Sequence, residues 1–409
     1  MLRFYHFLNE EKNVHMEHLE DVMLNNGVEG VRQSIDYLRA LRDMLVGNTA
    51  KSINVSIKWD GAPSVFSGID PRDGKFFVAK KGIFNRYPKV YKTPADIDVD
   101  TSGNLNAKLK LALEEFPKLG ITGVIQGDFL YSREDISEVD IDGASYITFH
   151  PNTIVYAIPK GSNLAKEILA SRIGVVWHTR YRGETFETMS ATFGEEITSN
   201  LQKTKTIWSV DAVYKDVSGS VNFNAKETKE ITAILSNASK IFSGLKHEAL
   251  NDISYNNELL IRIKTFINSK VRAGQPIGNT AVFVNDLIKY IHDYYQNEID
   301  KKVTDKSKAV WEAKRSESMK YFSNTPKIDI VKIFDLYDLI VEAKLMIVRK
   351  LDKAKTIGTF LKTVDGYKVT EQEGFVAIDH VGKNAVKLVD RLQFSRANFS
   401  TDIIKGWTK

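Results

Sequence analysis

The stretch Ile53-Asn54-Val55-Ser56-Ile57-Lys58-Trp59-Asp60-Gly61 decides how this chain is interpreted. The run up to Ile57 predicts a strand, and Asp60-Gly61 predicts a turn directly after it. Lys58 therefore lies where a strand ends. A lysine in such a place can act as a covalent nucleophile, provided that it is deprotonated and held in line with a phosphorus atom. The alternative is a surface lysine that precedes an ordinary turn.

The composition limits the class of protein and the kinds of site. With 43% hydrophobic and 27% charged residues, the 409-residue chain is typical of a soluble globular protein. No apolar run approaches the ~18 residues that span a membrane, and the N-terminus turns acidic too soon for a signal peptide, so we expect a cytoplasmic protein with no membrane partner. The absence of cysteine excludes disulfides, cysteine-based zinc sites and thiol catalysis. The net charge of +5 is compatible with a polyanionic partner.

The spacing of apolar residues predicts an α+β protein. Residues 1–50 are expected to form an N-terminal helical segment that packs on the core. Residues 51–183 and 356–409 are rich in predicted strands and are expected to form one domain. Between them, residues 184–355 have apolar side chains at helical spacing and Lys-rich polar faces, which predicts a large all-helical insertion. The predicted strands are 53–57, 76–80, 124–130, 146–149, 153–158, 173–179, 367–369, 374–379 and 385–389. The predicted helices are 15–25, 30–46, 106–116, 163–171, 226–249, 256–269, 281–298, 306–322 and 328–355.

Three later stretches carry charged residues on or beside predicted strands. The first, Phe77-Val78-Ala79-Lys80-Lys81-Gly82, ends in basic residues that could also be the solvated end of a strand. The second, Val124-Ile125-Gln126-Gly127-Asp128-Phe129-Leu130, is hydrophobic apart from its carboxylate. Because an isolated buried carboxylate is costly, a function explains Asp128 better than surface exposure does. The third, Glu371-Gln372-Glu373-Gly374-Phe375-Val376-Ala377-Ile378, is an acidic loop or a site, and a strand with Lys387 follows it.

These residue types suit the attack of a lysine on a nucleoside triphosphate. A free lysine has a pKa near ~10.4, and neighbouring cations or partial burial lower it. Lys80, Lys81 and Lys387 are the candidate cations. The α-phosphorus must become electrophilic and the charge of the departing pyrophosphate must be neutralised, which lysines and Mg²⁺ held by carboxylates do together. Since Mg²⁺ keeps several waters, two carboxylates can suffice.

The order of these motifs resembles that of the covalent nucleotidyltransferases, the superfamily of DNA ligases, RNA ligases and mRNA capping enzymes. The resemblance covers residues 51–183 and 365–392. It implies an ATP-grasp-like ligase nucleotidyltransferase domain, built from antiparallel sheets with flanking helices. It also implies ATP as the cofactor, with Mg²⁺ or Mn²⁺.

The resemblance assigns a role to each motif residue. Lys58 would take the AMP, and Asp60 would assist it or contact the ribose. Asp128 and Glu373 would serve the ribose and the metal. An adenine slot commonly has an aromatic face, and Trp177 stands where ligases place such a residue, with Phe149 as the alternative and a plain core position as the ordinary explanation of either. The nucleotide-binding residues implied in this way are Ile57, Lys80, Lys81, Asp128, Trp177, Glu373 and Lys387.

Several departures from the superfamily pattern favour an RNA ligase. Pro63 stands where DNA ligases and capping enzymes usually carry an arginine. Val389 stands where a second lysine is common, so either Lys383 or Arg391 substitutes or triphosphate binding is weaker. Too few residues follow Lys387 for the C-terminal OB domain of DNA ligases and capping enzymes.

We therefore predict a monomeric, ATP-dependent, RNA-ligase-like enzyme that seals 3′-hydroxyl to 5′-phosphate ends of RNA or DNA through a lysyl-AMP intermediate. The Lys-Trp-Asp-Gly-Ala-Pro region also resembles bacteriophage proteins, which would place the enzyme in a host cytoplasm. The alternatives are a DNA or hybrid-strand ligase, a nucleotidyltransferase that modifies a protein or nucleic acid without sealing, and a non-catalytic phage protein. The insertion would grip nucleic acid, unless its basic run is only a solvated helix face. The lysines assigned to this grip are Lys301, Lys302, Lys306 and Lys308.

Overall fold

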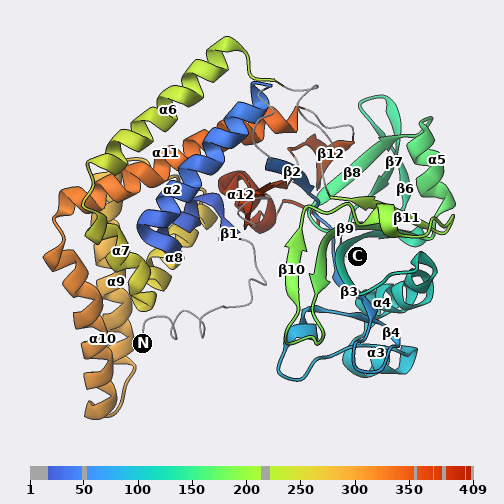
Figure 1. Ribbon diagram of the computed structural model, residues 1–409, viewed down its shortest axis with the longest axis horizontal. Coiled ribbons are helices and arrows are strands. Elements are labelled where there is room, and N and C mark those ends of the chain that lie inside the picture. The colour runs from blue at the N-terminus through green and yellow to red at the C-terminus, as the bar shows by residue number, and fades with distance from the viewer. Residues whose placement is uncertain are drawn as a thin grey trace.

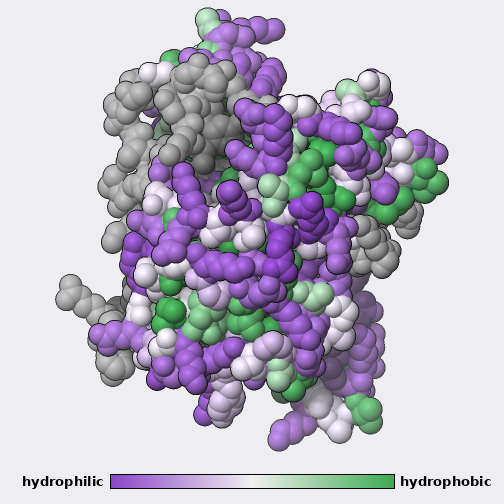
Figure 2. All heavy atoms as spheres, turned by 90° about the vertical axis from the view of Figure 1, so that its right-hand side faces the viewer, coloured by the Kyte–Doolittle hydropathy of each residue, from purple (hydrophilic) through white to green (hydrophobic). Residues whose placement is uncertain are grey.

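The computed structural model describes residues 17–47, 53–212, 222–353, 357–371, 373–379, 384–400 and 402–406. It is a mixed α+β structure in which a group of helices lies beside three β-sheets (Figure 1). None of the described helices is long and apolar enough to cross a membrane. The face on the side of the sheets is mostly hydrophilic, with small apolar patches (Figure 2).

The first sheet joins segments from both ends of the described chain. Its strand order is β1 (Glu17–His18), β15 (Asn384–Leu388), β14 (Gly374–Asp379) and β2 (Ile53–Lys58). β14 runs antiparallel to both of its neighbours, whereas β1 runs parallel to β15. This pairing places the lysine at the end of β2 beside segments from the other end of the sequence.

The second sheet curls into an antiparallel half-barrel. The curl brings one edge back toward the other, since the ring of Phe77 on β4 lies 5.5 Å from that of Phe186 in the β9–β10 turn. Helices α3 (Pro94–Asp100) and α4 (Gly103–Glu115) pack on its outer face through a shared hydrophobic core. The strand order is β10 (Ser190–Phe193), β9 (Ile173–Arg182), β5 (Val124–Ser132), β3 (Ser64–Ile69) and β4 (Phe76–Ala79), with β11 (Ile207–Asp211) parallel to β9.

The third sheet is antiparallel and carries helix α5 (Asn163–Ala170), whose Ala165 and Ile168 pack into its core. Its strands come from two separate parts of the sequence, so the chain returns to it after the helical group. The order is β13 (Gly366–Val369), β12 (Gly358–Thr363), β8 (Ile154–Pro159), β7 (Ala144–Phe149) and β6 (Ser137–Ile141).

The helices beside the sheets bury their apolar faces in one large core. Apolar residues three and four positions apart give each helix a stripe that must be covered by its neighbours. A shorter helix, α12 (Arg391–Phe399), follows β15 and packs against α8. The members of the group are α2 (Leu19–Leu45), α6 (Ala225–Ser243), α7 (His247–Tyr255), α8 (Asn257–Arg272), α9 (Thr280–Asp300), α10 (Asp305–Asn324) and α11 (Lys327–Asp352).

The structure corrects the predicted all-helical insertion at its start. Residues 190–193 and 207–211 form β10 and β11, so the helices begin only at α6. Both strands are too short to give a clear alternating pattern. Helix α2 of the N-terminal segment packs chiefly on α6, α7 and α11, and its buried residues share one hydrophobic core with those helices and with β2, β14 and β15.

Two predicted N-terminal helices form a single kinked helix, α2. The kink lies at Gly27, whose φ of 58° is a left-handed conformation that glycine adopts without strain. A side chain here would collide with Asn251, and the Asn251 Oδ1 atom accepts a hydrogen bond of 3.0 Å from the freed N–H of Val28. The break in the apolar pattern thus marks a contact with α7.

Candidate nucleotidyltransferase site

Lys58 and Glu373 meet at the end of the β2–β14 ladder. In this ladder Lys58 lies opposite Gly374, the residue after the glutamate. The Lys58 Nζ atom donates a hydrogen bond to the Glu373 Oε1 atom. The lysine side chain is 27% exposed and the glutamate side chain is 6% exposed, so the pair opens to solvent at its lysine end.

Lys387 lies on the next strand of the same sheet. It pairs with Val376 of β14 on one side and with His18 of β1 on the other. Burial lowers the pKa of Lys387, and the positive charge of Lys58 lowers it further. The sheet therefore places two lysines and a glutamate within electrostatic range of one another.

Asp128 approaches from the second sheet, and a glycine makes the approach possible. A Cβ atom added at Gly61 would lie 2.5 Å from the Asp128 Cβ atom and 3.1 Å from the Phe129 carbonyl oxygen. The turn after the lysine is also tied to β5 by a 2.9 Å hydrogen bond from the Ala62 N–H to that carbonyl. The Asp-Gly turn after β2 of the first sheet therefore packs directly against β5 of the second sheet.

The electrostatics of the Lys58–Glu373 pair are dominated by burial and by nearby acids. Burial raises the pKa of Glu373 to about 7, with Lys58 opposing the rise and the charges of Asp60 and Asp128 adding to it. Burial alone would lower the pKa of Lys58, but the contact with Glu373 outweighs it and raises that pKa. At neutral pH the lysine is therefore protonated, and its carboxyl partner is near its titration midpoint.

Asp60 holds a loop of the third sheet. Its carboxylate accepts hydrogen bonds from the Asn152 side chain at 2.7 Å and from the N–H groups of Thr153 and Ile154 at 2.7 and 2.8 Å. Its own N–H donates to the Tyr156 hydroxyl at 2.6 Å. These contacts favour a structural role over the predicted ribose contact, although its charge still acts on Lys58.

The two adjacent lysines after β4 differ in their partners. Lys80 makes an ion pair of 2.9 Å with Asp100 on α3. Lys81 starts the short 3₁₀ helix η1 (Lys81–Phe84) and makes no ion pair with the residues that the structure describes. Its charge contributes to the lowered pKa of Lys387. Lys81 is thus the better candidate for a phosphate contact.

The contacts of Trp177 favour a core position over the predicted adenine contact. Trp177 is fully buried on the outer face of β9, where its ring lies 5.2 Å from that of Phe116. The alternative, Phe149, is also buried, between the rings of Tyr131 and Tyr156.

Two rings that the sequence analysis missed lie closer to the motif residues. Because side chains alternate along a strand, His178 points to the opposite face from Trp177, and its Nε2 atom lies 3.6 Å from the Asp128 Oδ2 atom. That alternation could have identified His178 from the sequence. The Phe394 ring lies 5.9 Å from the Lys58 Nζ atom. It belongs to α12, a helix that the periodicity did not predict.

The carboxylates suit a metal that arrives with a nucleotide. Among the residues described, no group of three or more His, Asp or Glu side chains is arranged to hold a metal ion by itself. Asp128 and Glu373 remain as a pair, each acting electrostatically on Lys58. Mg²⁺ bound to triphosphate oxygens needs only one or two carboxylates, so this pair fits Mg²⁺ that enters with ATP. Of Ile57 the structure describes the backbone, paired with Phe375, but not the side chain.

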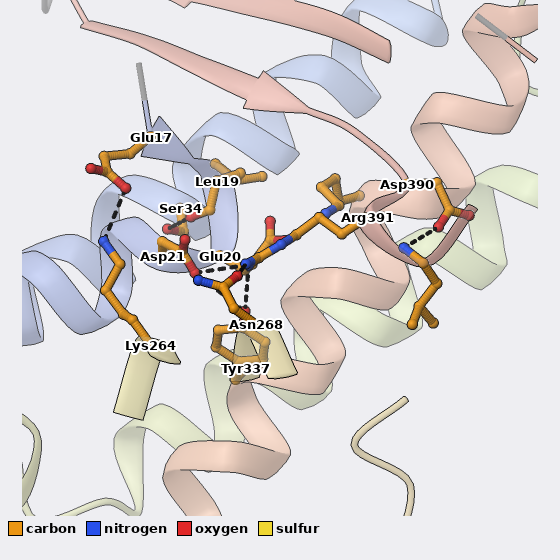
Figure 3. Close-up of polar contacts among 12 residues, drawn as sticks. Glu17, Leu19, Glu20, Asp21, Ser34, Lys264, Asn268, Tyr337, Asp390 and Arg391 are labelled. Carbon is orange, nitrogen blue, oxygen red and sulfur yellow. Dashed lines mark hydrogen bonds and ion pairs between the residues drawn. The ribbon is translucent and has the colours of Figure 1, made fainter. Parts of the chain in front are cut away.

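The contacts of Arg391 favour a structural role over replacement of the missing second lysine. Its guanidinium lies in a buried network at the start of α12 and donates to Asp21 at 3.0 Å and to the Tyr337 hydroxyl at 3.1 Å (Figure 3). A further contact joins it to Asn268 of α8. The network fastens α12 to the helical group. The other candidate for the second lysine, Lys383, lies outside the described residues.

The lysines predicted to grip nucleic acid are partly neutralised. Lys301 and Lys302 pair with Glu298 at 2.6 and 3.3 Å, and Lys302 also lies over the Trp311 ring at 4.8 Å. Lys306 is exposed and Lys308 half-buried, both on α10, which lies at the far end of the helical group from the sheets (Figure 1). This distance from Lys58 weakens the prediction.

The sequence matches a protein family described as a family of unknown function (DUF6267) over residues 13–403. The chain belongs to this family. No curated protein and no solved structure matches it. The family description names no activity, so the function must be argued from the site itself.

Proposed function

We propose that this DUF6267 protein is an ATP-dependent nucleotidyltransferase that joins polynucleotide ends and uses Lys58 as the residue that accepts AMP. The observation that carries the proposal is the contact between Lys58 Nζ and Glu373 Oε1 at the end of the β2–β14 ladder. Keeping a half-buried lysine against a carboxylate and beside a second lysine costs free energy, so the stability of the fold alone does not explain this arrangement. Perturbed groups that gather in this way mark a reactive site.

In the first step, the Lys58 Nζ atom attacks the α-phosphorus of ATP. A nitrogen–phosphorus bond forms, the bond from the α-phosphorus to its bridging oxygen breaks, and pyrophosphate leaves. Lys58 must lose its proton, and Glu373 is in contact with it and has a pKa raised by burial to about 7. A carboxylate with such a pKa is suited to accept a proton near neutral pH.

The leaving group needs positive charge close to the phosphates. Lys387 on β15 and Lys81 on η1 would supply it. The charge of Lys81 lowers the pKa of Lys387, so the two lysines are within electrostatic range of each other. Mg²⁺, bound by the phosphates and by Asp128, would neutralise further charge on the triphosphate. Fixed cations of this kind stabilise the charge that develops as the bond breaks.

Two transfers complete the proposed reaction. The AMP moves from Lys58 to a 5′-phosphate end, which breaks the nitrogen–phosphorus bond and forms a phosphoanhydride. A 3′-hydroxyl then attacks that 5′-phosphate, forms the phosphodiester bond and releases AMP. Pro63, in place of the arginine usual in DNA ligases, supports RNA ends over DNA ends.

The first test is covalent labelling with α-labelled ATP and Mg²⁺. The protein should gain one AMP, and peptide mapping should locate it on Lys58. Lys58→Ala should abolish the label, whereas Lys320→Ala, which removes an exposed lysine paired with Glu317, should not change it. Absence of the label from the parent, or its presence on another residue, refutes the proposal and favours a non-catalytic protein.

A second measurement separates sealing from simple transfer. Labelled protein is mixed with RNA and DNA ends in all four donor and acceptor pairings. Sealing of RNA ends alone is the expected result, and sealing of DNA or hybrid ends would identify the alternative ligase. Transfer of AMP without joining would identify a modifying nucleotidyltransferase.

A further inference from the structure

The cations that follow β4 fall into two sets. Three lysines in residues 80–92 are held by carboxylates, on α3 or in the β3–β4 turn. In the part of the chain that the structure describes, Lys81 and Arg86 make no ion pair. These two charges are therefore available to an external anion. The internal pairs are Lys80–Asp100 at 2.9 Å, Lys89–Asp100 at 2.8 Å and Lys92–Asp70 at 2.6 Å.

The loop that carries these two cations is firmly anchored. Ile83 is fully buried, and the Phe84 ring packs 4.8 Å from the ring of Tyr181 on β9. The Gly82 carbonyl oxygen accepts hydrogen bonds of 3.2 Å from the N–H groups of Asn85 and Lys89, which closes the loop. Whatever the loop presents at its surface is therefore held in a fixed position.

The tip of the loop presents an aromatic ring and a guanidinium group together. The Tyr87 side chain is 78% exposed, although a tyrosine ring would normally bury much of its apolar area. The Arg86 guanidinium lies 5.8 Å from the centre of this ring. An exposed ring beside a cation is the pair of groups that binds a base and its phosphate in single-stranded nucleic acids.

The loop of residues 81–87 begins near the group formed by Lys58, Glu373 and Lys387. Lys81, at its start, is near enough to Lys387 for its charge to lower the pKa of Lys387, and the charge of Lys58 lowers that pKa as well. The chain from Lys81 to Arg86 spans at most about 17 Å when extended. A polynucleotide end placed at Lys58 therefore has its adjoining nucleotides within reach of Arg86 and Tyr87.

We propose that residues 81–87 bind the polynucleotide strand next to the end that receives AMP. Lys81 and Arg86 contact its phosphates, and Tyr87 stacks on one of its bases. The strand is single-stranded or frayed at this point, because a base must leave the duplex to stack on a side chain. This inference rests on the proposed function and moves the nucleic-acid contact from α10 to the edge of the half-barrel.

The test measures binding of a short, fluorescent, 5′-phosphorylated oligoribonucleotide by anisotropy, in the absence of ATP. Arg86→Ala combined with Tyr87→Ala should weaken binding about tenfold or more, since stacking and phosphate contacts are both lost. The slope of log affinity against log salt should fall by about 0.7, the value for one phosphate contact to a single strand. Tyr87→Phe alone should keep most of the affinity because it keeps the ring.

A matched control removes the same two residue types elsewhere. Arg32→Ala with Tyr255→Ala takes an exposed arginine and a tyrosine that is 83% exposed from the helical group, and should leave binding unchanged. Equal binding by the parent and the Arg86/Tyr87 variant, equal loss in both double variants, or no binding by the parent overturns the inference.

AMP labelling of the same variants separates this inference from the proposed function. The Arg86/Tyr87 variant should be labelled on Lys58 like the parent, because neither residue is among those assigned to ATP. Normal labelling with unchanged oligonucleotide binding refutes the loop assignment and leaves the nucleotidyltransferase intact. If the parent binds the oligonucleotide but takes no label, and the Arg86/Tyr87 variant loses that binding, the loop is supported as a nucleic-acid surface and the proposed function is refuted.

Discussion

Two lysine–glutamate pairs, Lys344–Glu20 and Lys58–Glu373, use the same chemistry in different surroundings. Lys344 and Glu20 are each 1% exposed and 2.8 Å apart, between α11 and the start of α2. Lys58 is 27% exposed while its partner Glu373 is 6% exposed. Burial by itself would raise the pKa of either glutamate. For Glu20, the charges of Lys344, His18 and Arg391 outweigh burial and lower the pKa to about 2. For Glu373, burial prevails and the pKa is raised to about 7.

The difference comes from the neighbours of each carboxylate. Glu20 lies among cations, with Arg391 3.5 Å away in addition to Lys344. Glu373 has Lys58 on one side but senses the negative charges of Asp60 and Asp128. A buried carboxylate surrounded by cations is fixed in its charged form and stabilises the fold, whereas one surrounded by acids exchanges its proton near neutral pH.

The largest expected effect is on the free energy of unfolding, which should fall much more when Glu20 is replaced than when Glu373 is replaced. Glu20→Gln should lower the free energy of unfolding by about 3–5 kcal/mol, because it leaves the Lys344 ammonium buried without a charged partner. Glu373→Gln should lower it by about 1 kcal/mol or less, since a carboxyl group near its midpoint is already half neutral and Lys58 reaches water. Urea denaturation at pH 7 measures both values. Similar losses for the two variants would contradict the distinction.

The second effect is on the first chemical step. Glu373→Gln should reduce the rate of AMP labelling on Lys58 about a hundredfold or more, because the variant keeps the shape of the site but cannot accept the proton. Asp128→Asn should cause a loss of similar size. The control is Glu317→Gln, which removes one partner of an exposed pair on α10. Labelling by Glu373→Gln at close to the parent rate would show that the carboxylate is only structural.

The third effect should distinguish the steps of the reaction. Lys387→Ala should slow labelling by ATP about tenfold to a hundredfold, because a cation that stabilises the leaving pyrophosphate is lost. Sealing of a strand that already carries AMP should be affected much less, since no pyrophosphate leaves in that step. Single-turnover assays with the two substrates give the comparison. Equal losses in both assays would assign Lys387 to the fold or to the strand instead.

The smallest effect is the dependence of labelling on pH. Below about pH 7 Glu373 takes up a proton, so it can no longer accept the one from Lys58, and the rate should fall about tenfold between pH 8 and pH 6. Because this folded-state pKa lies above the unfolded value of about 4.3, the same protonation stabilises the fold at low pH, and that contribution is lost as pH rises through about 7. Glu373→Gln should lack this titration. A parent rate that is flat across this range would exclude Glu373 as the proton acceptor.

Much of the fold could be predicted from periodicity. Strands β2, β5, β8, β9 and β14 were predicted within a few residues, because each has an apolar run between turn residues. Strands β10 and β11 were missed because they are only four and five residues long, too short for a clear alternating pattern; both pair with β9. The helix α12 was missed because it has no apolar stripe of its own, and a buried arginine network holds it in place.

The sequence by itself determined which residues are candidates for the chemistry. The three motifs each contain a glycine, Gly61, Gly127 or Gly374, at a position where a side chain would collide with a neighbouring segment. Because this requirement falls on single residues within short motifs, it can be seen in the sequence. Only the tertiary structure decided what those residues do. Glu373 reaches Lys58 across 315 positions of sequence, and Trp177 turns into the core while His178 turns toward Asp128. Lys80 pairs with Asp100, whereas Lys81 has no ion pair with the residues that the structure describes. The physical reason is that burial and charge partners set a side chain's protonation and availability, and both come from segments that are distant in the chain.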